Sequence, residues 1–265
     1  SLNLKSLNES TGVPSLSRNA LHSIKVTLPS LPEQKKIAEI LSGIDRSLDS
    51  IDLKIAKLIQ KRQSILQRIF SLKDNSNFNS KELGDLADFY SGRAFKSREL
   101  SQEGIKITRI SNLHKPNFPY WHFQGEYNPK LIAQEGDILF SWAGVANSIN
   151  IHRYHGEDTL LNQHIYNFKF HNALMKEWSF YYVKYLLPFL RSQIEGGAGQ
   201  LHLMKRDVQS IKIPIFENHL IESSVKFLKS IDITIDAYKK KKSKILIIKK
   251  GLSADLLSGR KRVSV

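Results

Sequence analysis

The sequence predicts an α+β protein in which a mixed α/β domain is attached to two long antiparallel coiled-coil helices. Three observations lead to this fold class. Residues 32–72 and 217–258 each carry apolar side chains at alternating spacings of three and four. The segment between them, residues 82–215, holds most of the glycines and all three tryptophans. The two ends of the chain also resemble each other at an offset of 187 residues.

The first long helix is expected over residues 32–72. Pro32 suits a first helical turn, and Glu33 favours the positive end of the helix dipole. The apolar stripe follows a heptad pattern that only Arg62 interrupts, and such a stripe needs a partner helix along its whole length. At ~1.5 Å per residue the helix is about 60 Å long, which exceeds what a compact domain uses. The stripe consists of Ile37, Leu41, Ile44, Leu48, Ile51, Ile55, Leu58, Ile65, Ile69 and Leu72.

A polar linker, residues 73–81, separates this helix from the mixed domain. Strand-like runs in the domain are residues 105–110, 138–140 and 165–170. A helix is expected from Trp178 to Arg191, with Pro188 disturbing its end.

The second long helix is expected over residues 217–258. Lys242 and Lys249 interrupt its stripe, and the globular segment that precedes it permits the chain to return antiparallel to the first helix. This stripe consists of Leu228, Ile231, Ile235, Tyr238, Ile245, Leu252 and Leu256.

The match between the chain ends needs no gap over roughly 60 residues. The offset of 187 places Gly12 on Gly199 and the Ser-Ile-Lys of residues 23–25 on residues 210–212. It also aligns the two helical stripes. The sequence therefore predicts an internal duplication, in which the tail of a globular domain and a long helix occur twice.

The charge of the chain indicates a polyanionic partner. Forty Lys and Arg outnumber 25 Asp and Glu, which gives a net charge of +15. Clustered cations displace counterions from phosphates, so double-stranded DNA is the simplest partner. An inert basic surface, an anionic membrane and an acidic protein stay open on charge alone. Cysteine is absent and no apolar run is long enough to span a membrane, so a cytoplasmic protein without a membrane partner is expected.

Several motifs occur in an order that resembles the specificity subunit of type I restriction–modification systems. Residues 28–45, LPSLPEQKKIAEILSGID, are similar to the start of the conserved helical region of that family. Residues 12–17 are similar to the end of the family's target recognition domains. Residues 92–95 and 107–113 are similar to the opening of such a domain, and residues 136–141 and 161–165 to its middle. The resemblance covers nearly the whole chain.

The resemblance implies two target recognition domains at opposite ends of the helix pair, each reading one half of a bipartite DNA site. On this basis residues 1–30 are the tail of a first recognition domain and residues 31–73 the first conserved helix. Residues 74–215 are a complete target recognition domain, and residues 216–265 the second conserved helix with a basic tail. The chain departs from the pattern, because only one recognition domain is complete and residues 216–220, Phe-Glu-Asn-His-Leu, lack the Pro-Glu-Gln of the first repeat.

The resemblance also implies partners. A specificity subunit directs DNA methyltransferase (modification) subunits and a restriction/translocase subunit to the target site, and it is not itself catalytic. No cofactor and no metal are expected, and a homodimer stays open. The alternative is a coiled-coil assembly scaffold whose central domain binds protein in place of DNA.

Three groups of residues are candidates for DNA contact, because Arg, Asn and Gln match base edges and Lys and Arg clamp phosphates. The first group follows the glycines of residues 196–199, which allow close backbone approach. For each residue the structural alternative is a loop side chain or a solvated surface charge. The candidates are Gln200, His202, Lys205 and Arg206, then Arg93, Lys96 and Arg98, and then Arg109, Asn112, His114 and Lys115.

Other features favour structural roles. Trp142 suits core packing better than insertion into a DNA groove, and His164 suits a hydrogen-bonding role in the core. Ten Lys or Arg between Lys239 and Arg262 either clasp phosphates or a subunit, or form a solvated helical face. The Asn-Phe-Pro-Tyr of residues 117–120 departs from the Asn-Pro-Pro-Tyr motif of amino-methyltransferases, so methylation by this chain is disfavoured.

Overall fold

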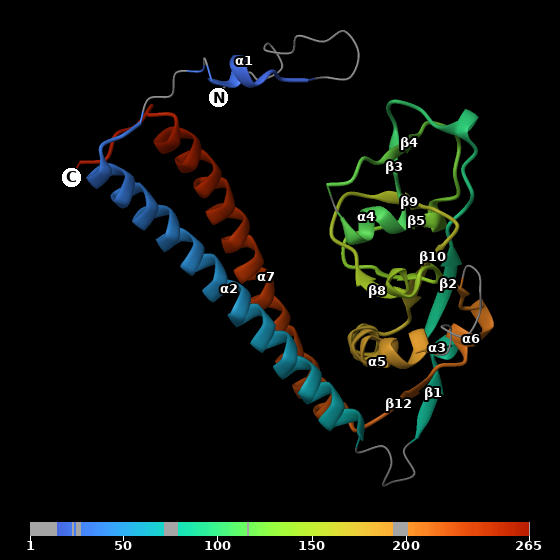
Figure 1. Ribbon diagram of the computed structural model, residues 1–265. Coiled ribbons are helices and arrows are strands. Elements are labelled where there is room, and N and C mark those ends of the chain that lie inside the picture. Colours follow the sequence, from blue (N-terminus) through green and yellow to red (C-terminus); the bar gives the residue numbers. More distant parts are fainter. Residues whose placement is uncertain are drawn as a thin grey trace. The chain divides into compact units, whose positions relative to one another are not determined.

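The computed structural model describes residues 15–22, 24, 28–71, 79–115, 117–192 and 201–264. It combines two long helices with several small sheets (Figure 1), which confirms the α+β fold class. The chain divides into two compact units. We call Ser1–Gln60 together with Asp232–Val265 the stalk unit, and Lys61–Ile231 the domain unit.

Two helices form the stalk unit, α2 (Leu31–Ser71) and α7 (Asn218–Leu257), each of which continues into the domain unit. Their bounds differ by one residue at each end from the expected 32–72 and 217–258. Within the stalk unit Lys249 pairs with Asp45, and Lys242 pairs with Asp52 at 2.6 Å. From the first pair to the second, the residue number rises by seven on α2 and falls by seven on α7. The two helices are therefore antiparallel. The two lysines that interrupt the stripe of α7 are therefore ion-pair partners of α2.

Apolar side chains fill the seam between these helices in the stalk unit. Ile37, Leu48 and Ile51 of α2 are buried, as are Ile235 and Leu256 of α7. Burial of this kind supplies most of the stability of a long helix pair. The prediction that the two helices pair within one chain is confirmed.

A third ion pair fixes the segment that follows α7. Arg262 donates to Glu33 at 2.6 Å, and the Glu33 side chain, in the first turn of α2, is almost fully buried. The backbone N–H of Val263 donates to the same carboxylate. The end of the second repeat is thereby held on the start of the first long helix.

The duplication predicted from the sequence extends to the structure. Helix α1 (Arg18–His22) becomes helix α6 (Lys205–Gln209) when 187 is added to each of its bounds. The same addition takes the first residue of α2, Leu31, to the first residue of α7, Asn218. The matched glycines at positions 12 and 199 lie outside the described residues.

A central antiparallel sheet forms the framework of the domain unit. Its strand order is β2-β10-β6-β8. Helix α5 (Ala173–Ser192) contributes four buried aromatic residues to the core. The final turns of α2 join them through Phe70, whose ring lies 5.0 Å from Trp178 and 4.7 Å from Tyr182. The strands are β2 (Ala87–Ser91), β10 (Ile165–Phe170), β6 (Ile138–Ser141) and β8 (Asn150–Arg153).

A second sheet has the order β4-β3-β9-β5, in which β3 and β9 are parallel. Two small ladders, β1-β12 and β7-β11, complete the strand pairing of the described residues. The remaining strands are β1 (Ser80–Glu82), β3 (Ile105–Thr108), β4 (Trp121–Phe123), β5 (Ile132–Ala133), β7 (Ala143–Gly144), β9 (Thr159–Leu161), β11 (Leu201–His202) and β12 (Lys212–Pro214). The short helices are α3 (Leu83–Leu86), α4 (Ile110–His114), η3 (Ser97–Glu99), η4 (Pro129–Leu131) and η5 (Ala146–Ser148).

Three local expectations need correction. The strand expected over residues 105–110 ends at Thr108, because the side chain of Asn112 accepts a hydrogen bond from the Arg109 N–H and starts α4. The helix expected from Trp178 begins earlier, at Ala173, where the preceding Asn172 caps two backbone N–H groups. It continues past Pro188 to Ser192. The end of the expected linker forms β1, while residues 72–78 lie outside the described residues.

An ion-pair network around the buried Glu177 connects three elements of the domain unit. Glu177 on α5 accepts two hydrogen bonds from Arg153 on β8, at 2.8 and 2.5 Å. Lys229 on the first part of α7 lies 3.3 Å from the same carboxylate. This network ties the domain to the helix that follows it.

Candidate nucleic-acid interface

Four chain segments meet where strands of the central sheet end. Strand β11 pairs with β7, and the Leu203 N–H donates to the Trp142 carbonyl at 3.1 Å. The Trp142 N–H in turn donates to the His164 carbonyl at 3.2 Å, and Arg93 bridges to Asn162. We call residues 91–93, 142–148, 162–164 and 201–206 the loop face. Loops on a rigid sheet are a common platform for binding residues.

The first candidate group is partly described. Gln200 lies outside the described residues, and of His202 only the backbone, in β11, is described. Lys205 donates to the Phe89 carbonyl at 3.2 Å. The Arg206 side chain is 85% exposed, with Asp207 at 3.7 Å. Lys205 and Arg206 therefore belong to the loop face, with Arg206 in the better position to reach a partner.

Arg93, from the second group, is held from several sides. Its guanidinium lies 4.0 Å from the Phe95 ring and 4.7 Å from the Phe123 ring, and it donates to Glu99 at 2.8 Å. Hydrogen bonds from the Lys96 backbone and the Arg93 side chain lower the pKa of Glu99. These contacts favour a structural role for much of the Arg93 side chain, whereas Lys96 and Arg98 lie exposed beside it. DNA contact by this group stays a prediction.

The third group divides in two. Arg109 stacks on the Trp121 ring at 4.0 Å and donates to the Pro119 carbonyl at 2.6 Å, and burial lowers the pKa of its guanidinium. Asn112 is 3% exposed and donates to the Phe118 carbonyl at 2.8 Å. This bonding explains Asn112 as a structural residue of α4.

His114 and Lys115 lie exposed at the other end of α4. The His114 ring lies 5.3 Å from that of His152, on β8. Arg109 neighbours the loop face, because Asn162 donates to the Thr108 carbonyl next to it. The structure therefore brings Arg93, Arg109, Lys205 and Arg206 toward one region, and gives no such contact for His114 and Lys115.

The loop face contains exposed residues that the sequence did not single out. Val145 is 71% exposed, directly after Gly144, whose φ of 109° few other residues adopt. Asn147 and Gln163 are exposed as well, and their amides are the side-chain type that reads adenine. The glycine between the strand end and Val145 was the available signal, but a single glycine is too common to identify a site.

Trp142 and His164, both in the loop face, pack against each other. The Trp142 ring stacks on Tyr166 at 5.6 Å and meets His164 at 5.2 Å. This stacking favours core packing of Trp142 over insertion into a groove.

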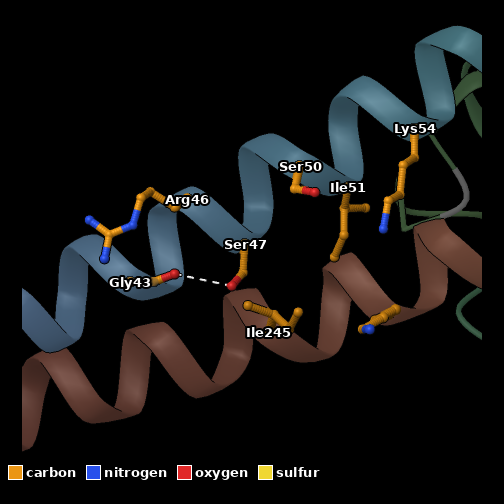
Figure 2. A pocket seen from close by; sticks show the side chains of 8 residues that line it. Gly43, Arg46, Ser47, Ser50, Ile51, Lys54 and Ile245 are labelled. Atoms are coloured by element: carbon orange, nitrogen blue, oxygen red, sulfur yellow. Dashed lines mark hydrogen bonds between the residues drawn. The ribbon is translucent and has the colours of Figure 1, made fainter.

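The stalk unit has a groove of its own, of about 420 Å³. Its floor is open because Gly43, Ser47 and Ser50 are small; a Cβ added at Gly43 would meet only the Arg46 side chain, at 3.8 Å. Figure 2 shows these residues on α2, with Ser47 and Ile51 pointing toward α7, which carries Ile245. Arg46, Lys54 and Lys241 also line the groove, and none of the eight lining residues carries a carboxylate.

The described residues contain no group of three or more His, Asp or Glu side chains arranged to hold a metal ion. Within the same residues, no helix has the length and apolar content needed to cross a bilayer.

Comparisons with known proteins give consistent matches. A family model described as the type I restriction modification DNA specificity domain matches residues 1–61 and 75–246. The type I restriction enzyme MjaVIII specificity subunit of Methanocaldococcus jannaschii is 27% identical, over 98% of this chain and 67% of the relative. The putative type I restriction enzyme MjaX specificity subunit of the same organism is 25% identical, over 94% of this chain and 62% of the relative.

Solved structures share the fold. The S subunit of a type I restriction-modification system from M. genitalium matches with a TM-score of 0.64 and 21% identity, over 95% of this chain and 68% of that one. The HsdS subunit from Thermoanaerobacter tengcongensis matches with a TM-score of 0.52 and 18% identity, over 97% of this chain and 66% of that one. The chain thus spans about two thirds of the length of these relatives.

Proposed function

This chain belongs to the type I restriction–modification DNA specificity family, and on that premise we propose that it reads a DNA sequence for a methyltransferase and restriction complex and carries no reaction centre of its own. The observation that carries this proposal is the loop face. It combines an exposed arginine and exposed amides on loops that a sheet supports, in a chain of net charge +15. Nothing in the described part of the chain favours the scaffold alternative.

The domain assignment supports the same proposal. We assign residues 1–30 to the tail of a first recognition domain, residues 74–215 to a complete one, and residues 31–73 and 216–265 to the conserved helices. The matching bounds of α1 and α6 support a common origin for the two tails. The proposed partners are DNA, the methyltransferase subunits and the restriction/translocase subunit, and the proposed location is the cytoplasm. A homodimer of this chain is proposed as a further assembly.

We expect alanine variants of Gln200, His202, Lys205 and Arg206 to weaken DNA binding in two distinguishable ways. Loss of a phosphate-binding cation should weaken all sequences alike and lower the salt slope by roughly one. Loss of a base-reading side chain should cost about 1–3 kcal/mol and relax specificity at one position. Binding is measured on the target selected from a random duplex library and on a scrambled duplex, with the methyltransferase present.

The control for these variants is Lys130→Ala, an exposed lysine on η4. It should bind both duplexes like the unaltered protein. If all four variants also do so, residues 200–206 do not read DNA, and Lys96, Arg98, Asn147 and Gln163 become the next residues to test.

The stalk groove is the proposed docking site for a methyltransferase subunit. Its small residues leave room for a helix of the partner, and its three cations favour acidic side chains on that helix. Ile248 is exposed on α7, seven residues after Lys241 and so on the same side of the helix, and it provides further contact area. A partner helix laid along the groove would bury it.

We expect Gly43→Phe to weaken binding of the methyltransferase subunit at least tenfold by filling the groove. The fold should tolerate the change, because the Cβ position at Gly43 is open. Ser42→Phe is the matched control, since Ser42 is exposed and about 100° further round the helix. Affinity is measured by co-purification and titration at low and moderate salt. Equal binding by both variants would exclude the groove, and failure of the unaltered chain to bind its verified methyltransferase would exclude the partner.

A further inference from the structure

A pocket of about 720 Å³ in the domain unit has no role in the site described so far. It lies where the last turns of α2 meet the end of α5 and the start of β8. Six of its lining side chains bear N–H donors, and none of the twelve lining residues carries a carboxylate. The donors are Arg62, Gln63, Gln67, Asn150, Lys184 and Arg191.

Two of these cations are held in position. Arg191 donates from Nε and Nη2 to the Ile149 carbonyl, at 3.0 and 2.8 Å. A carbonyl leaves the positive charge of the guanidinium uncompensated, unlike a carboxylate. The Lys184 ammonium lies 4.9 Å from the Phe180 ring, in a cation–π contact.

His152 on β8 reports a positive local potential. Burial, followed by the charges of His114, Lys184 and Arg191, lowers the pKa of His152 to about 3. The imidazole is therefore neutral at physiological pH. The same cations that suppress its protonation would attract an anion to the pocket.

One stretch of chain leads from the loop face to the pocket. Asn150 at the start of β8 pairs with Ser141 at the end of β6, and residues 142–148 of the loop face connect those two strands. Ile149, which binds Arg191, lies between them in sequence. The loop face therefore ends in sequence within two residues of Asn150, which lines the pocket.

We propose that this pocket binds the phosphodiester backbone of the DNA whose bases the loop face reads. Guanidinium, ammonium and amide groups are the side chains that proteins use for phosphate contacts, and a site without carboxylates avoids repelling them. The apolar remainder of the lining, which includes the exposed Phe189, faces the less polar surface of the sugars. This inference rests on the proposed function and adds the position where the DNA backbone is held.

Two variants test the proposal and leave the Arg191–Ile149 hydrogen bonds of the pocket intact. Lys184→Gln removes one cation, and Gln67→Glu adds a negative charge at an exposed lining position. Each should lower the affinity for the selected target and for the scrambled duplex by the same factor, about tenfold. Lys184→Gln should also reduce the salt slope by roughly one. The full chain is assayed with its methyltransferase, and Lys130→Gln is the control.

The outcomes are distinct. Unaltered protein that shows no preference for any selected target would overturn the proposed function, and with it this inference. Specific binding that both variants retain unchanged would overturn the pocket alone. If the variants lose affinity for the selected target but not for the scrambled duplex, the pocket reads bases. If they lose affinity for the methyltransferase but not for DNA, the pocket is a protein-docking site. Both results contradict the proposal.

Discussion

Replacing Leu48 with aspartate is expected to lower the free energy of unfolding by about 3–5 kcal/mol. Leu48 is 7% exposed in the seam between α2 and α7. The variant loses the buried apolar side chain and brings a carboxylate into a site that offers it little water. Both effects act in the same direction. Urea unfolding followed by helical circular dichroism measures the change.

Leu53→Asp is the matched control, because Leu53 is on the same helix but 57% exposed. It should change the free energy of unfolding by less than about 0.5 kcal/mol. If Leu48→Asp unfolds at the same denaturant concentration as this control, the seam does not carry the stability of the stalk.

Glu177→Gln should destabilise the protein by roughly 3 kcal/mol, because it removes the buried carboxylate that pairs with both Arg153 and Lys229. The side chain of Glu177 is 10% exposed, so water compensates little. Glu157→Gln is the control: that carboxylate also pairs with a lysine, Lys106, but it is 79% exposed, so its loss should leave stability unchanged.

The same network predicts a pH dependence. Burial raises the pKa of Glu177, but hydrogen bonds and charges from Arg153 and Lys229 outweigh it, so the pKa is lowered from about 4.5. A lowered pKa in the folded state means that the stabilisation is present above about pH 4.5 and is lost as the pH falls through the folded value. The stability difference between the unaltered protein and Glu177→Gln should therefore shrink below pH 4.5. A difference that stays constant down to acid unfolding would contradict this assignment.

The sequence predicted the helices better than the loops, for physical reasons. A heptad stripe repeats over forty residues, so it determines α2 and α7 to within one residue, and even its interruptions at Lys242 and Lys249 have a simple explanation across the seam. The strand expected over residues 105–110 was wrong at its end because one side chain, Asn112, starts a helix there. Single capping contacts of this kind leave little trace in residue patterns.

The candidate site was less accessible to sequence reasoning. Arg93 and Arg109 carry the charge expected of DNA contacts, but aromatic rings distant in sequence, such as Phe123 for Arg93, hold them in the domain. Asn147 and Gln163 come together with Lys205 only through backbone pairing of strand ends. Composition indicates a polyanionic partner, whereas the positions of the residues that read DNA depend on where the sheet brings its loops.

The two central ion pairs of the stalk resolve an ambiguity inherent in a heptad repeat. An apolar stripe repeating every seven residues packs almost equally well when one helix slides by a full heptad. A slide in one direction would pair Asp52 with Lys249 but leave Asp45 opposite Leu256; a slide in the other would pair Asp45 with Lys242 but leave Asp52 opposite Ile235. Each misaligned state keeps one pair and sets a carboxylate against an apolar side chain. Of these three alignments, only the native one forms both ion pairs. The ion pairs therefore fix the length of the stalk, and with it the distance between its two ends.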